Sequence, residues 1–246
     1  MEQFILTPNC PAGKVSLAAA GNYPEITAAL IKEGIRVISL ANPALNTEVS
    51  SHSDMLLCHT GDNTVFIDPS QNKDVFIREG FRAVTCSPLA ENYPGDVKLN
   101  IAVSRDFFIC NNKTADKSLL SFLSAAGKKE INVNQGYTKC SVCFVTENAV
   151  ITEDPSIEAA LKNTEIDVLT ISKGDIYLSE NHYGFFGGST GKISKDTLAV
   201  TGEMKYHRDA HAITDFCNKH GVIIKELKKG VIADIGGILP LKEVRL

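Results

Sequence analysis

A unit made of a β-hairpin, a helix and a strand is clearest in the middle of the chain. Two β-rich runs, residues 140–145 and 149–152, flank Glu147-Asn148, and Asn tolerates the backbone conformation of a tight hairpin turn. Asp154-Pro155 then predicts the start of a helix, because Asp can cap free amides and Pro suits a first-turn position. The β-branched run at 167–172 follows as a strand. This stretch therefore predicts the order hairpin, helix, strand.

The helix and strand of this unit recur four more times. Each copy has a helix start, an apolar stripe at helical spacing, a glycine stop and a β-rich run. The starts are Asn22-Tyr23-Pro24, Pro69-Ser70, the cap Thr114 and the cap Asp209; the stops are Gly34, Gly80, Gly127 and Gly221; the strands are 35–40, 81–86, 130–134 and 222–227. Stops recur about every 47 residues, so five units use up the 246 residues and predict one domain over 1–246.

Four of the helices are preceded by a predicted hairpin, and the fifth hairpin is predicted to be split between the chain ends. The four tips are Asp62-Asn63, Arg105-Asp106, Glu147-Asn148 and Lys195-Asp196. In the split hairpin, residues 231–241 give the first strand and residues 4–7 the second, so that the ends pair and no sheet edge is left exposed. The alternative is an ordinary α/β sheet with the same alternation of strands and helices.

Composition narrows the classes of partner. The net charge of −4 with dispersed basic residues predicts no nucleic-acid partner, and no apolar run is long enough for a membrane span. The N-terminal residues lack a secretion signal, which predicts a cytoplasmic protein. In that reducing compartment, the seven cysteines are expected to be buried thiols.

Five such units closing on themselves resemble the pentein superfamily, which includes the guanidino-group-modifying enzymes. Two segments carry most of the sequence similarity. One is GGILPL at 236–241, which is similar to a Gly-Gly-x-x-Cys tract near the C-terminus of those enzymes, and the other is the hairpin at 139–154. The chain looks most like a bacterial branch of that superfamily. The resemblance implies an α/β fold, specifically a five-bladed α/β propeller with pseudo-fivefold symmetry. It also implies a cysteine that attacks a guanidinium carbon, a histidine that handles protons, and carboxylates that bind the cation.

Two positions depart from the pentein pattern. Pro240 stands where the resemblance places the cysteine nucleophile, and the tract at 187–190, where a histidine is expected, contains none, although His182 lies nearby. The usual chemistry is therefore not supported at its usual positions, and other side chains must supply it if it occurs.

The resemblance also implies that the first strand of each hairpin starts at the propeller axis. These segments are His52-Ser53-Asp54, Lys98-Leu99-Asn100, Lys139-Cys140-Ser141, Gly187-Gly188-Ser189 and Asp234-Ile235-Gly236. Cys140, with its pKa lowered by Lys139, is the candidate nucleophile and His52 the candidate base. The candidate ligand-binding residues are Asp54, Asn100, Lys139, Ser141, Gly187, Gly188, Ser189 and Asp234.

Structural alternatives remain open for the same residues. The alternative for Cys140 is a small buried residue of a strand. Asp54 can cap a turn, and Asp234 can hold its loop. Lys139 can neutralise an aspartate or bind an anion, and Asn100, Ser141 and Ser189 can satisfy backbone groups.

Neither a metal nor a cofactor is predicted. Cys140 and Cys143 form a C-x-x-C pair, but residues three apart on a strand face opposite sides. His207 and His211 lack an evident third ligand. The glycine-rich tract at 184–192 does not have phosphate-loop spacing, and its Gly187-Gly188 pair is expected to allow a close approach at the axis. Tyr183, Phe185 and Phe186 are interpreted as a lid or a subunit contact. The second interpretation would make the protein a homo-oligomer.

Two functions follow. One is a non-catalytic pentein that binds a small polar ligand, with guanidino or amidino compounds as a candidate class, or a macromolecular partner. The other is an amidinohydrolase or amidinotransferase in which Cys140 attacks, His52 is the base, and Asp54 and Asp234 hold the amidinium group.

Overall fold

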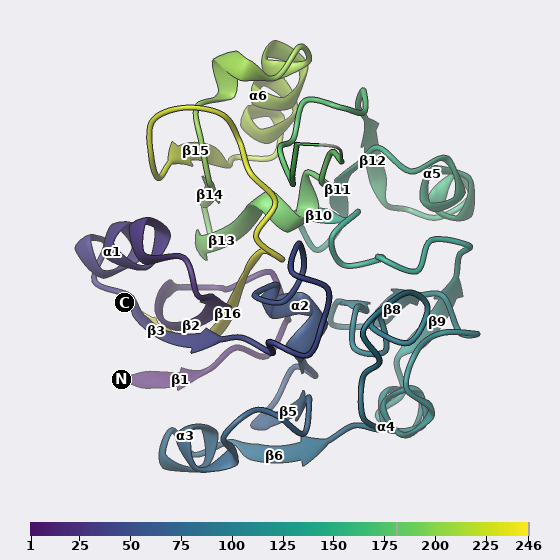
Figure 1. The fold of residues 1–246 in the computed structure, drawn as a ribbon. Helices are drawn as coiled ribbons and strands as arrows, with labels where there is room; N and C mark the ends of the chain where they lie inside the picture. The colour runs from purple at the N-terminus through teal and green to yellow at the C-terminus, as the bar shows by residue number, and fades with distance from the viewer. Residues whose placement is uncertain (181, 246) are drawn as a thin grey trace.

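Peripheral helices surround a central region in which several short sheets meet. The computed structural model of the protein describes residues 1–180 and 182–245. Figure 1 shows helices α1, α3, α4, α5 and α6 around the outside, whereas the short helix α2 lies near the middle. Within these described residues, the strands form one seven-stranded sheet and three three-stranded sheets. The predicted α/β class is therefore confirmed, in the form of several small sheets.

Each three-stranded sheet contains an antiparallel hairpin, and a helix then leads to a third strand that pairs in parallel with the second. The first comprises β4 (Leu57–His59), β5 (Thr64–Ile67), α3 (Lys73–Arg78) and β6 (Arg82–Thr85). The second comprises β7 (Ala102–Val103), β8 (Phe107–Cys110), α4 (Lys117–Ala125) and β9 (Lys129–Asn132). The third comprises β10 (Cys143–Thr146), β11 (Ala149–Thr152), α5 (Pro155–Leu161) and β12 (Asp167–Thr170).

The seven-stranded sheet contains the same order twice. One group is β13 (Thr190–Ser194), β14 (Thr197–Val200), α6 (Ala210–Lys219) and β15 (Ile223–Glu226). The other is β16 (Ile238–Val244), β2 (Lys14–Gly21), α1 (Pro24–Lys32) and β3 (Arg36–Leu40), with β1 (Glu2–Phe4) beside β16. The remaining elements are α2 (Ser53–Leu56) and the 3₁₀ turns η1 (Gly187–Ser189) and η2 (Met204–Tyr206). The four predicted hairpin tips all lie between paired strands.

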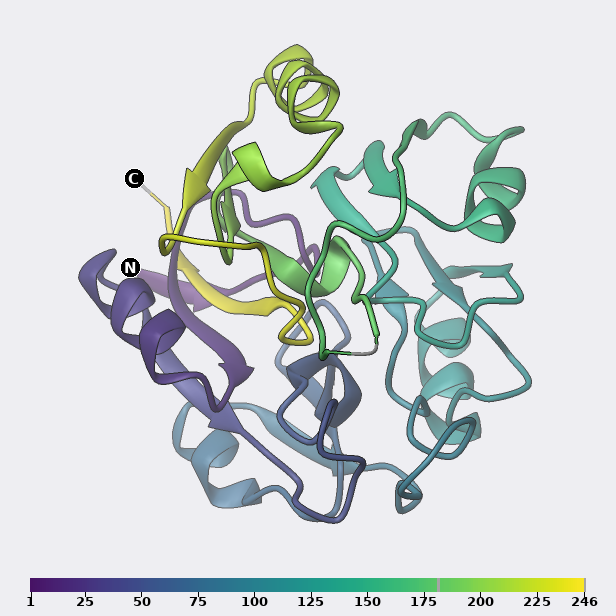
Figure 2. The ribbon, with the colours of Figure 1, turned by 45° about the horizontal axis from the view of Figure 1, so that its top comes forward.

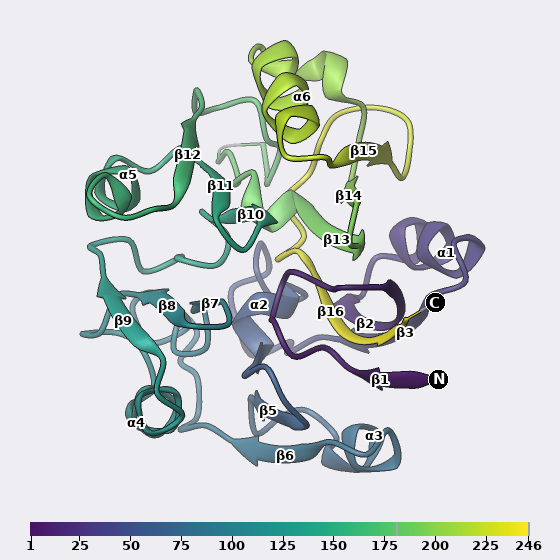
Figure 3. The same ribbon diagram turned by 180° about the vertical axis from the view of Figure 1, so that it is seen from behind.

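The two ends of the chain pair, as predicted, but the strand that leads from this pair into the helix differs from the predicted one. β16 pairs with β1 on one side and with β2 on the other, and the labels N and C lie close together in Figure 3. The strand that leads into helix α1 is thus β2 and not residues 4–7. The prediction was wrong because Ala18, Ala19 and Ala20 lack the bulky side chains typical of strands. All three are fully buried, where small side chains suit a crowded sheet.

Helix starts follow the predicted capping chemistry only in part. The Asp154 carboxylate accepts hydrogen bonds from the backbone N–H groups of Ser156 and Ile157, as expected for a cap. Helix α4 is capped by Asp116 instead of Thr114. Asp209 occupies the N-cap position of α6 but makes no side-chain cap bond, because its carboxylate accepts a hydrogen bond from Ser172 N.

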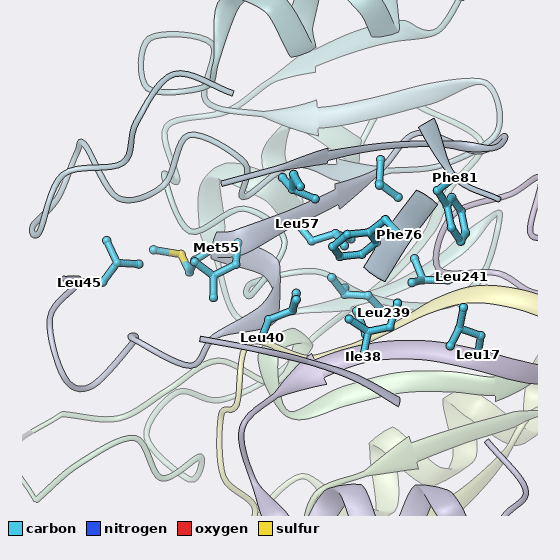
Figure 4. Packing of buried hydrophobic residues seen from close by; sticks show 14 of the residues in the cluster. Leu17, Ile38, Leu40, Leu45, Met55, Leu57, Phe76, Phe81, Leu239 and Leu241 are labelled. Atoms are coloured by element: carbon cyan, nitrogen blue, oxygen red, sulfur yellow. The ribbon is translucent and has the colours of Figure 1, made fainter. Parts of the chain in front are cut away.

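The apolar core fixes the short helix α2. Figure 4 shows Met55 and Leu57 among the residues of a buried cluster that also contains Phe76 from α3 and Leu239 from β16. Met55 and Leu56 are fully buried. Because side chains in a close-packed core have little freedom, this packing fixes the position of the residues just before them, His52 and Asp54.

All seven cysteines are buried, as predicted, and none is paired with another within the described part of the chain. Among residues 1–180 and 182–245, each helix is too short or too polar to cross a bilayer.

Candidate functional site

The five polar segments predicted to converge do meet in the structure. Figure 2 shows the chain that enters β16 close to helix α2. Four hydrogen bonds link the segments directly: Asp54 N donates to Gly236 O (3.1 Å), Lys139 N to Asn100 Oδ1 (2.6 Å), Gly188 N to Cys140 O (2.8 Å) and Ile235 N to Gly188 O (2.9 Å). The order is closed by Asn100 Nδ2, which donates to the Sδ atom of Met55, the residue after the first segment (3.3 Å). The segments therefore hold one another in place. His52-Ser53-Asp54 enters α2 and not a strand, which corrects the predicted strand start.

Three of the predicted side chains gather at the centre of this arrangement. One ligand atom each from His52, Cys140 and Asp234 lies within 4.8 Å of the others, and all three residues are buried. The Nδ1 atom of His52 is 3.6 Å from Asp234 Oδ1, which is too far for a hydrogen bond. Cys140 Sγ donates to Asp54 Oδ2 at 3.0 Å and accepts from Asn100 Nδ2 at 3.3 Å.

The electrostatic surroundings favour the protonated form of the Cys140 thiol. Burial raises its pKa well above the ordinary value near 9.0, and the carboxylates of Asp54 and Asp234 raise it further. Burial also raises the pKa of Asp54 to about 6, although the charge of Lys139 acts in the opposite direction. The net shift of the thiol pKa is therefore upward, opposite to the lowering expected beside Lys139, because burial and two acidic neighbours raise it.

A cavity of about 400 Å³ lies over this centre. Its lining includes three acidic residues, Glu48, Asp96 and Asp234, together with His52 and Cys140. Its aromatic lining residues are Tyr93, Tyr137, Tyr183 and Phe185. The cavity thus combines negative charge with ring faces, which is a combination that binds organic cations.

The other predicted ligand-binding residues support the site from outside the cavity. Asp54 and Asn100 contact Cys140. Lys139 lines a different and much smaller cavity, where its Nζ lies 3.4 Å from Gly187 O. Ser189 donates to Phe186 O, and Ser141 Oγ has no partner among the described residues.

The predicted close approach at Gly187-Gly188 is present. A Cβ added to Gly188 would lie 2.0 Å from Asp234 Oδ1, and one added to Gly187 would lie 2.5 Å from Cys140 O. Phe186 is fully buried in the core, which corrects its expected place in a lid or subunit contact, whereas Tyr183 and Phe185 line the cavity.

Sequence reasoning missed Asp96 and the aromatic residues beside it. Asp96 Oδ2 accepts a hydrogen bond from Tyr137 Oη at 3.1 Å, while Oδ1 is buried and has no partner among the described residues. Burial raises the pKa of Asp96. The Tyr137 ring stacks on Phe185 with centroids 6.1 Å apart. The only available signal was that an aromatic and acidic loop, residues 92–96, separates two units.

The other candidate pairs do not form sites. His207 is buried and its Nδ1 accepts a hydrogen bond from Asp209 N, whereas His211 is exposed. Cys143 packs in a hydrophobic cluster with Phe186, whereas Cys140 lines the cavity.

Sequence comparison places the chain in a known family. A family model described as a family of unknown function (DUF6873) matches residues 19–239. The chain belongs to this family. No curated protein matches it by sequence.

Solved structures with the same fold come from distant sequences. An inosamine-phosphate amidinotransferase from Streptomyces griseus has a TM-score of 0.60 at 11% identity, and the match covers 96% of each chain. DDAH from Pseudomonas aeruginosa, as a mutant complexed with citrulline, has a TM-score of 0.52 at 9% identity over 92% of this chain and 96% of that one. An agmatine deiminase from C. jejuni has a TM-score of 0.52 at 12% identity over 92% of this chain and 91% of that one. These proteins are penteins, so the resemblance to that superfamily is confirmed at the level of fold.

The departures from the pentein pattern are visible in the structure. Pro240 lies buried in β16, opposite Ala18, and lines the small cavity with Lys139. His182 reaches the large cavity but is mostly exposed, and its Nδ1 is 3.0 Å from Glu48 Oε1. The buried imidazole and thiol of this cavity are instead His52 and Cys140, which come from other segments.

Proposed function

We propose that the protein binds a small cationic ligand of the guanidino or amidino class in the cavity above His52, Cys140 and Asp234. The observation that carries this proposal is the unpartnered, buried Oδ1 atom of Asp96 beside a stacked aromatic wall. A buried carboxylate without a cationic partner is costly, and a bound cation would offset that cost.

The geometry favours a planar cation over a compact one. A guanidinium group can donate two parallel N–H bonds to a carboxylate and can stack on an aromatic ring. Asp96 and the rings of Tyr93 and Tyr137, whose centroids are 5.7 Å apart, offer both contacts in one place. The cavity volume of about 400 Å³ is typical of small-molecule sites.

The structural relatives support the same ligand class. Their names include an amidinotransferase and an agmatine deiminase, and one structure contains citrulline. Fold similarity does not transfer an activity by itself, so the residues of the cavity carry the proposal and the relatives add to it.

We also propose that the five hairpin, helix and strand groups are the blades of one propeller domain spanning residues 1–246, with the cavity on its axis. The closed order of hydrogen bonds among the five segments supports this arrangement, as does the pairing of β16 with β2. The axis would then be the one place where side chains from every blade converge.

The Asp96 carboxylate is expected to decide affinity for the ligand. Asp96→Asn should weaken binding of agmatine by at least about tenfold, because hydrogen bonds to a charged partner contribute about 1.5–3 kcal/mol. Titration calorimetry on metal-free protein measures this change. Glu91→Gln removes an exposed acid from the same loop outside the cavity lining and is the matched control. Equal affinities for the wild type and both variants, or no agmatine binding at all, would exclude the proposal.

The distance between Cys140 and Asp54 favours a second candidate, an amidine-cleaving enzyme. Cys140 Sγ would attack the amidino carbon while its proton passes to Asp54 Oδ2, 3.0 Å away, or to the base His52. Ammonia would leave from the tetrahedral adduct, and water would then release the ureido product. Asp234 would hold the cation.

Incubation with agmatine followed by ammonia and product analysis tests this candidate. Cys140→Ser should abolish any turnover and preserve agmatine binding. Turnover that persists in Cys140→Ser would reject Cys140 as the nucleophile, and its absence from the wild type would leave binding as the function.

A further inference from the structure

We propose that His52, Cys140 and Asp234 form a site for a divalent transition metal, and that Zn²⁺ suits it best. Their ligand atoms are an imidazole nitrogen, a sulfur and a carboxylate oxygen, all within 4.8 Å of one another. Zinc bonds of about 2.0–2.3 Å place tetrahedral ligands roughly 3.3–3.8 Å apart. Small side-chain shifts would therefore bring all three groups onto one ion.

The imidazole of His52 is the strongest sign of a missing partner. Its side chain is only 2% exposed, and neither ring nitrogen has a hydrogen-bond partner among the described residues. The contact of 3.6 Å to Asp234 Oδ1 is too long to serve as one. Buried polar atoms are nearly always paired, and a metal ion would accept the lone pair of one ring nitrogen.

The chemistry of the three ligands selects the metal. Imidazole and thiolate favour zinc and related transition metals, whereas Mg²⁺ and Ca²⁺ prefer oxygen ligands. A thiolate and a carboxylate together carry two negative charges, which balance Zn²⁺ in a buried site. When the S–Zn bond forms, the Cys140 thiol loses its proton to Asp54 or to solvent.

Neighbouring groups already hold the ligands. The backbone N–H groups of Phe185 and Gly236 each donate to an Asp234 carboxylate oxygen at 2.9 Å. Asn100 Nδ2 contacts Cys140 Sγ at 3.3 Å. Such contacts orient ligands and strengthen metal binding. With three protein ligands, a fourth coordination position stays open, as in catalytic zinc sites, and the ligands line the cavity.

Metal titration of the full-length protein tests this proposal without any organic ligand. After removal of metals with EDTA, the protein should bind one equivalent of Zn²⁺, measured by equilibrium dialysis and elemental analysis. With Co²⁺ it should show a thiolate-to-cobalt charge-transfer band in the near ultraviolet. His52→Gln, Cys140→Ser and Asp234→Asn should each weaken zinc binding at least tenfold, and Cys140→Ser should also lose the band.

Two control variants separate the site from other metal-binding groups. His182→Gln removes an exposed imidazole that lines the same cavity, and Cys143→Ala removes a buried thiol three residues away; both should retain zinc binding and the band. Circular dichroism establishes that each variant is folded. If a ligand variant does not fold, the metal site is judged from the cobalt band of the wild type and from the change of that band in the variants that do fold.

Absence of saturable zinc binding by the wild type overturns the metal site. So does a zinc affinity in all three ligand variants that equals the affinity of the wild type. The Asp96→Asn measurement uses metal-free protein and a residue outside the ligand set. Failure of the metal site and failure of the proposed organic ligand are therefore distinguishable.

Discussion

Gly236→Ala should destabilise the protein by about 2–5 kcal/mol and abolish both agmatine and zinc binding. Gly236 has φ +72°, and a Cβ there would lie 2.4 Å from His52 Cα. The left-handed conformation costs Ala about 1–2 kcal/mol, and overpacking adds about 1–3 kcal/mol. The added methyl group would push His52 away from Asp234, whose Oδ1 accepts a hydrogen bond from Gly236 N at 2.9 Å. Urea unfolding and ligand titration measure the two effects.

Gly127→Ala is the matched control for this substitution. Gly127 follows helix α4 with φ +79°, and a Cβ there would have no atom within 4 Å. Gly127→Ala should therefore lower the stability only by the cost of the left-handed backbone conformation, about 1–2 kcal/mol, and should leave agmatine and zinc binding intact. Equal losses of stability in the two variants, with binding preserved in both, would show that the contact with His52 does not hold the site together.

Glu153→Gln should remove a pH dependence of stability. Burial raises the pKa of Glu153 from near 4.5 to about 8 in the folded protein. Its Oε1 accepts a hydrogen bond from Phe186 N, and Oε2 has no partner among the described residues. Between pH 4.5 and 8 the unfolded chain has lost this proton whereas the folded chain keeps it. Glu153 therefore lowers the free energy of unfolding by up to about 1.4 kcal/mol per pH unit as the pH rises through this window.

Chemical unfolding of both proteins at a series of pH values measures this contribution. The wild type and Glu153→Gln should be most similar in stability near pH 4.5, and the variant should become progressively more stable relative to the wild type up to pH 8. Glu158→Gln changes an exposed glutamate of helix α5, and its stability should depend on pH in the same way as that of the wild type. Parallel curves for Glu153→Gln as well would show that Glu153 ionises normally in the folded state.

Local signals made much of the fold predictable. The cap Asp154, the turn Glu147-Asn148 and the stop glycines act over a few residues, so a single sequence is enough to place them. Aligning the predicted units also placed His52, Cys140 and Asp234 near one another, because equivalent positions of similar units meet. The same alignment did not identify β2 as the strand between β16 and helix α1, since that pairing depends on long-range packing.

The remaining parts of the site depend on side-chain direction and on loops. Lys139 and Cys140 are adjacent in sequence, yet they line different cavities, and no sequence pattern reports that divergence. Asp96 and Tyr137 lie in connections outside the helices and strands, where no periodic signal exists. His52 caps and Asp54 belongs to a single turn of helix, which is too short to show a helical period.

The position of β16 between β1 and β2 has a consequence for biosynthesis. Gln3 Nε2 donates to Glu243 Oε1 across a sequence separation of 240 residues, and β16 follows every other described strand in the chain. During translation, β1 and β2 are therefore synthesised long before β16, the strand with which both of them pair. The segment carrying Asp234 leads directly into that strand, so the pocket is completed only when synthesis of this stretch has ended and the slowest contacts of the molecule have formed.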